Sequence, residues 1–104
     1  MDVSLGLSRE KLSDFCRRWQ VSELAVFGSV LRDDFRSDSD IDMLVAFLPG
    51  ATWSLLDHAR MQHELAAMFG RPVDLITRRA VERSHNPIRR RAILSTAEPI
   101  YVAR

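Results

Sequence analysis

The chain has 104 residues, of which 46% are hydrophobic and 28% charged, which is typical of a single globular domain over residues 1–104. Fifteen Lys and Arg residues against fourteen Asp and Glu residues leave a net charge of +1, so no overall charge draws the protein to nucleic acid or to an anionic membrane. We expect a cytoplasmic protein, because no apolar run reaches the roughly 18 residues that span a bilayer and the N-terminus lacks a secretory signal pattern.

The first predicted element is an amphipathic helix near the N-terminus. Ser8 is a suitable N-cap. Four apolar residues follow at the i, i+3, i+4, i+7 spacing of one helix face: Leu12, Phe15, Cys16 and Trp19. Cys16, the only cysteine, is expected to be a small core residue and not a nucleophile, because no histidine or other base lies near it in sequence.

The remaining elements follow with compact turns between them. In chain order they are a strand at 23–27, a strand at 41–47, a helix from 54 to 69, a strand at 73–77, a helix from 86 to 96 and an edge strand at 99–102. This order predicts the α/β (α+β) class, with a small mixed sheet flanked by helices.

An acidic segment precedes and enters the second strand. Five aspartates and one arginine give residues 33–42 a local charge of about −4: Asp33, Asp34, Asp38, Asp40, Asp42 and Arg36. Asp40 and Asp42 point to the same side because side chains alternate along a strand. At about 4 Å and an effective dielectric of 20, two carboxylates repel by about 4 kcal/mol, so the pair favours a bound cation such as Mg²⁺. The alternative is a solvated turn with carboxylates capping backbone amides.

Gly28 and Ser29 follow the first strand. A glycine at this point lets the backbone approach a ligand closely. Free amides at the start of a helical turn, together with the Ser29 hydroxyl, could hold a phosphate. A phosphate cradle would then lie beside the cation site.

Gly28-Ser29, ten residues and then Asp40-x-Asp42 resembles the motif of nucleotidyltransferases of the DNA polymerase beta superfamily. The stretch GSVLRDDFRSDSDIDMLV is similar to its minimal nucleotidyltransferase (MNT) branch. The third carboxylate of that family comes from a later strand, where this chain has Asp74. The alternative for Asp74 is a cap on the turn into that strand.

The resemblance implies a polymerase-beta-like nucleotidyltransferase fold and an assignment of residues. The implied catalytic and Mg²⁺-holding residues are Asp40, Asp42 and Asp74, and the implied nucleotide-binding residues are Gly28, Ser29 and Arg32. An acceptor hydroxyl would attack the α-phosphate of a nucleoside triphosphate, and pyrophosphate would leave. Asp74 would help to deprotonate the acceptor hydroxyl. Arg32 could equally form a structural salt bridge.

MNT proteins of this size resemble the antitoxin halves of two-gene modules whose partners are HEPN ribonucleases. The resemblance implies transfer of AMP from ATP to a hydroxyl of the partner, expected to be tyrosine, within a hetero-oligomer, so that the ribonuclease is silenced. Two alternatives are nucleotidyl transfer to a small molecule or an RNA end, and an antitoxin that acts by binding alone.

A second charged region is basic. Six arginines and one glutamate give residues 78–91 about +5: Arg78, Arg79, Arg83, Arg89, Arg90, Arg91 and Glu82. This region is either a basic patch or a solvated helix face. No aromatic residue interleaves with the arginines, so direct binding of nucleic acid is not expected. His58 and His63 miss the spacing of a metal pair on a helix, and Trp53 is either a partner contact or a cap on the core.

Overall fold

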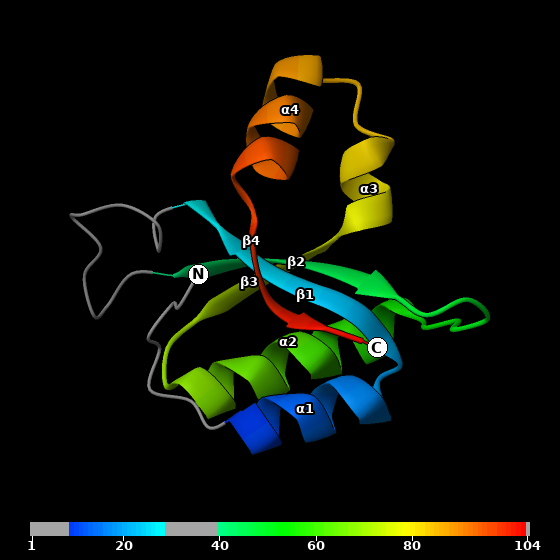
Figure 1. The fold of residues 1–104 in the computed structure, drawn as a ribbon, viewed down its shortest axis with the longest axis vertical. Coiled ribbons are helices and arrows are strands. Elements are labelled where there is room, and N and C mark those ends of the chain that lie inside the picture. The colour runs from blue at the N-terminus through cyan, green and yellow to red at the C-terminus, as the bar shows by residue number, and fades with distance from the viewer. Residues whose placement is uncertain (1–8, 29–39, 104) are drawn as a thin grey trace.

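The computed structural model describes residues 9–28 and 40–103. In these residues the elements are α1 (Arg9–Arg18), β1 (Val21–Phe27), β2 (Ile41–Phe47), α2 (Leu55–Phe69), β3 (Val73–Thr77), α3 (Arg78–Glu82), α4 (Pro87–Thr96) and β4 (Glu98–Val102). The strands form one sheet in the order β3-β2-β1-β4. β1 is antiparallel to both of its neighbours, whereas β2 and β3 are parallel. The expected mixed sheet flanked by helices is confirmed (Figure 1).

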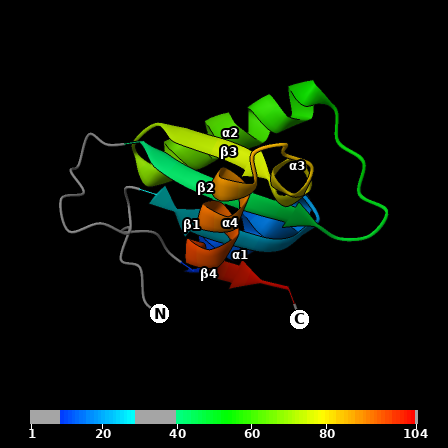
Figure 2. The same ribbon diagram turned by 90° about the horizontal axis from the view of Figure 1, so that it is seen from above.

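Helices cover both faces of this sheet. α1 and α2 lie side by side on one face, and α3 and α4 lie on the other (Figures 1 and 2). The larger core, under α1 and α2, consists of Leu12, Phe15, Cys16, Val21, Leu24, Val26, Ile41, Met43, Val45, Met61, Leu65, Val73 and Leu75. The smaller core, under α3 and α4, consists of Ala25, Leu44, Val81 and Ile93. Residues of β1 and β2 that point to opposite faces of the sheet therefore serve two different cores.

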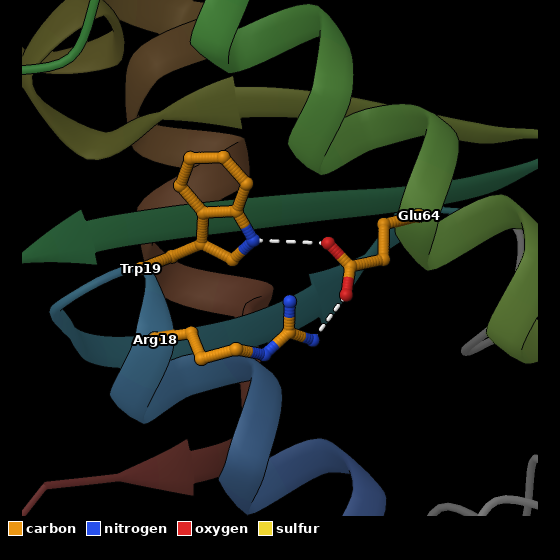
Figure 3. Close-up of polar contacts among 3 residues, drawn as sticks. All are labelled: Arg18, Trp19 and Glu64. Carbon is orange, nitrogen blue, oxygen red and sulfur yellow. Dashed lines mark hydrogen bonds and ion pairs between the residues drawn. The ribbon is translucent and has the colours of Figure 1, made fainter.

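Polar contacts join α1 to α2 at the edge of the larger core. Glu64 forms an ion pair with Arg18 and accepts a hydrogen bond from the Trp19 indole nitrogen at 3.0 Å (Figure 3). Burial opposes ionisation of Glu64, but the hydrogen bonds from Arg18 and Trp19 outweigh it and lower the pKa of this carboxyl. Trp53 donates to the Trp19 carbonyl at 3.0 Å, and the two rings meet edge to face. Trp53 is thus a cap on the core.

The N-terminal helix has the buried face predicted from its spacing. Leu12, Phe15 and Cys16 are buried, and Trp19 lies one residue beyond the end of α1. Burial raises the pKa of the Cys16 thiol to about 12, so Cys16 is an inert core residue, as expected. The proposed N-cap, Ser8, lies outside the described residues.

Two boundaries and one helix differ from the sequence prediction. β1 begins at Val21 instead of residue 23, and β4 begins at Glu98 instead of residue 99. α3 was not predicted, because its five residues follow β3 without a break and Thr77 serves both as the last strand residue and as the N-cap. The capping box of α2 is confirmed, with Ser54 and Asp57 bonded reciprocally.

No helix in the described part of the chain combines the length and the apolarity that crossing a bilayer requires.

Substitution of two leucines of α2, one buried and one exposed, tests the position of the larger core. Leu65 is fully buried and Leu55 is 87% exposed. We expect Leu65→Ala to lower the free energy of unfolding by about 2–5 kcal/mol, because it leaves a cavity in the larger core. Leu55→Ala should change it by less than about 0.5 kcal/mol. Urea unfolding of both variants measures the difference, and equal losses would contradict the core described above.

Candidate active site

The candidate site lies at the end of the sheet where β1 ends and where β2 and β3 begin. Asp42 is the register partner of Phe27 on β1 and of Asp74 on β3. Register partners of neighbouring strands point to the same face of a sheet. Two residues further along the strands, Leu44 is part of the smaller core and Ile76 packs against it. Asp42 and Asp74 therefore lie on the face that α3 and α4 cover.

Gly28 brings the end of β1 directly against Asp42. Its φ of 74° lies in the left-handed region that favours glycine. A Cβ atom at this position would collide with Oδ2 of Asp42 and lie 3.3 Å from its Cγ. A side chain at this position would therefore strain the backbone and displace the Asp42 carboxylate. The expected approach of this backbone to a ligand stays a prediction, and Ser29 and Arg32 lie outside the described residues.

Asp42 carries the perturbed charge of this site. Its pKa is raised above the usual value of 3.8, first by burial, then by the negative charges of Asp74 and Asp40. The positive charge of Arg89, on α4, opposes this rise without cancelling it. Partial burial and two acidic neighbours thus make ionised Asp42 costly in the protein alone, and a cation between the carboxylates would remove that cost.

The donor set is compatible with Mg²⁺. Asp40, Asp42 and Asp74 offer hard carboxylate oxygens, which Mg²⁺ prefers. Within the described ranges, no three His, Cys, Asp or Glu side chains are grouped as a ready-made metal site. A cation bound at Asp42 and its neighbours would complete its shell with water and substrate oxygens, as Mg²⁺ commonly does.

Two side chains of α2 hold the backbone of β3 next to Asp74. β3 is an edge strand, so half of its backbone groups have no strand partner. At Leu75, Nε2 of His58 donates to the carbonyl oxygen at 2.6 Å, and Oε1 of Gln62 accepts from the amide at 2.9 Å. Both backbone groups of the residue that follows Asp74 are therefore fixed. This role was not predicted, because the spacing of His58 and His63 along the helix bears only on metal binding.

The arginine-rich segment divides into structural and exposed residues. Arg78 pairs with Glu23 at 3.6 Å and with Glu82 at 3.8 Å. Arg90 donates to the Ser84 carbonyl at 3.1 Å and so ties the loop before α4 to that helix. The other members of the segment are exposed: Arg79, Arg83, Arg89 and Arg91. The prediction of a solvated helix face thus holds for the exposed arginines. The charge of one of them, Arg89, also lowers the pKa of Asp42.

Comparison with known proteins decides the family. A profile of the nucleotidyltransferase domain matches residues 8–97. The chain belongs to the nucleotidyltransferase domain family. This nucleotidyltransferase is 33% identical over 95 residues to a protein of Methanocaldococcus jannaschii named as a candidate protein adenylyltransferase, covering 91% of this chain and 96% of that protein. It is also 37% identical over 67 residues to the protein adenylyltransferase MntA of Thermococcus cleftensis, covering 62% of this chain and 64% of MntA.

Solved structures share the fold of this nucleotidyltransferase. A candidate minimal nucleotidyltransferase is 40% identical, with a TM-score of 0.66 and 88% of each chain covered. A structure of a tri-AMPylated Shewanella oneidensis HEPN toxin in complex with an MNT antitoxin contains a chain that is 20% identical, with a TM-score of 0.55 over 90% of this chain and 69% of that one. At 20% identity the likeness concerns the fold alone. The resemblance to minimal nucleotidyltransferases is confirmed.

Removing the charge of Asp42 should stabilise the nucleotidyltransferase on its own. Because the folded state raises the pKa of Asp42, ionised Asp42 destabilises that state at neutral pH, and the penalty fades as the pH falls toward the unfolded value near 3.8. We expect Asp42→Asn to raise Tm at pH 7, with a gain that shrinks as the pH approaches 4. Asp14→Asn, on the exposed side of α1, is the control. An unchanged or lowered Tm at pH 7 for Asp42→Asn would contradict the repulsion.

The His58 contact can be tested against the second histidine of the same helix. We expect His58→Ala to cost roughly 1–3 kcal/mol in urea unfolding, because it leaves the Leu75 carbonyl without its donor. Gln can place a donor near Nε2, so His58→Gln should retain much of the stability. His63 is exposed, and His63→Ala should change stability by less than about 0.5 kcal/mol. Equal effects of His58→Ala and His63→Ala would show that the contact does not stabilise β3.

Proposed function

We propose that this nucleotidyltransferase is an Mg²⁺-dependent protein adenylyltransferase and the antitoxin of a HEPN-type ribonuclease. In this proposal it transfers AMP from ATP to a tyrosine hydroxyl of the partner and thereby silences it. The observation that carries the proposal is the register pairing of Asp42 with Asp74 beside Gly28, in a chain of the nucleotidyltransferase domain family.

Relatives support the choice of acceptor. The M. jannaschii relative and MntA are named as protein adenylyltransferases, one of them as a candidate. In the Shewanella complex, an MNT antitoxin is bound to a HEPN toxin that is tri-AMPylated. A domain of this size offers little room for a private acceptor pocket, so an acceptor presented by a protein partner suits it.

The proposed reaction assigns each site residue a task. The backbone at Gly28 and the Ser29 hydroxyl bind phosphate oxygens. Asp40, Asp42 and Asp74 would hold Mg²⁺, which when bound neutralises the phosphates and orients the α-phosphate. Arg32 remains either a phosphate contact or a structural residue.

The chemical step is an in-line displacement at the α-phosphorus. Asp74 helps to remove the proton of the tyrosine hydroxyl, and the tyrosine oxygen forms a bond to the α-phosphorus. The bond between that phosphorus and the bridging oxygen of pyrophosphate breaks, and pyrophosphate leaves with the electron pair. Holding acceptor and donor in this geometry supplies much of the acceleration. The added phosphate charge on the partner would then interfere with its ribonuclease activity.

The decisive experiment combines the protein with the proposed HEPN-type partner, ATP and Mg²⁺. We expect mass spectrometry to show one or more AMP additions on partner tyrosines, together with loss of ribonuclease activity. Asp40→Asn/Asp42→Asn should abolish both effects, because the phosphates would no longer be neutralised. Asp14→Asn, on α1, should retain them.

Two results would overturn the proposal. A partner that gains no AMP with the wild-type protein would exclude adenylyl transfer to it. A partner that is silenced equally well by Asp40→Asn/Asp42→Asn would indicate neutralisation by binding alone.

A further inference from the structure

A pocket of about 230 Å³ lies between α3, α4 and the sheet. Its apolar surface is formed by Ile76, Val81 and Ile93, and Ala80 forms part of its wall. Arg89 and Arg90 also line it. Val81 and Ile93 are themselves nearly buried, so packed side chains of the smaller core form the floor.

The pocket begins close to the carboxylates. Ile76 follows Asp74 by two residues on the same face of β3, which places the start of the floor about 7 Å along the strand from Asp74. Arg89, on α4, lines the same pocket as Ile76. A molecule with one end at the aspartates can therefore extend over Ile76 into the pocket.

The lining selects for a ring attached to an anion. None of the described residues that line the pocket is acidic. Apolar side chains favour a flat, weakly hydrated group, and an arginine guanidinium both stacks on aromatic rings and pairs with phosphate. Among the reactants of the proposed transfer, the nucleotide combines a planar ring with a chain of phosphates, separated by one sugar.

We propose that the pocket between α3 and α4 receives the base of the donor nucleotide, with Arg89 lying against the base or its adjoining phosphate. This inference rests on the proposed nucleotidyl transfer and adds a binding site formed by Ile76, Ala80, Val81, Arg89 and Ile93. The pocket is large enough for a base but not for a whole nucleotide, because complete ligand sites usually span about 300–1,000 Å³. The phosphates would consequently remain at the strand ends.

Calorimetry with two probes separates the base from the phosphates. Mg²⁺–ATP contains both parts, and Mg²⁺–tripolyphosphate contains only the phosphate chain. Ala80 is exposed on α3 and lines the pocket, so Ala80→Leu narrows it. We expect this variant to bind ATP about tenfold more weakly and tripolyphosphate with unchanged affinity, because only packing against the base is lost. Arg89→Ala should also weaken ATP about tenfold.

Matched controls lie on the opposite side of α4. Ala92 and Arg91 are exposed residues that line a separate hollow, so Ala92→Leu and Arg91→Ala should leave ATP affinity unchanged. ATP affinity that is unchanged in both Ala80→Leu and Arg89→Ala would overturn the inference. Equal weakening of ATP and tripolyphosphate by Ala80→Leu would also overturn it, because the effect would then concern the phosphates.

The same titrations separate this inference from the proposed function. A wild-type protein that binds neither probe would contradict the proposed nucleotidyl transfer. A wild-type protein that binds ATP and tripolyphosphate equally well would retain a phosphate site and contradict the base pocket.

Discussion

The charge of Asp42 is the constraint around which the candidate site is arranged. Its carboxylate is partly buried, lies against Gly28 and shares its surroundings with Asp74 and Asp40. Like charges held together in this way raise the free energy of the protein alone and give a divalent cation a place to bind. The positive charge of a divalent cation would offset this repulsion, so the carboxylates are compatible with such an ion.

The rest of the fold keeps these charges together. β2 is central, with β1 and β3 on its two sides, and its apolar residues serve the cores on both faces of the sheet. His58 and Gln62 fix the outer edge of β3 at Leu75, while α4 brings Arg89 over the same face. The larger core resists movement of the strands, so the backbone positions of Asp42 and Asp74 are fixed relative to each other.

Local sequence signals were sufficient for most of the fold. Apolar alternation gave β2 with its observed bounds, and the Ser54–Asp57 capping box and Asn86-Pro87 marked the starts of α2 and α4. α3 escaped prediction because a five-residue helix carries too little periodicity. The motif around Gly28, Asp40 and Asp42 also identified the family, since it combines glycine, serine and aspartates at a defined spacing.

Contacts that depend on strand pairing could not be predicted. The sequence suggested that Asp74 joins the other carboxylates only through the family resemblance; its register with Asp42 follows from the parallel pairing of β2 and β3. The support of Leu75 by α2 and the approach of Arg89 to Asp42 link residues far apart in the chain. No local pattern encodes such pairs. The roles of Ser29 and Arg32 stay predictions from the motif.

The most direct test is an NMR titration of the Asp42 carboxyl carbon in the wild-type protein, with and without Mg²⁺ and ATP, and in Asp74→Asn. We expect the pKa of Asp42 to lie above its usual range in the protein alone and to fall both when Mg²⁺ and ATP bind and when the Asp74 charge is removed. An Asp42 that titrates in its usual range and responds to neither change would contradict the central claim that carboxylate repulsion prepares this site for a cation.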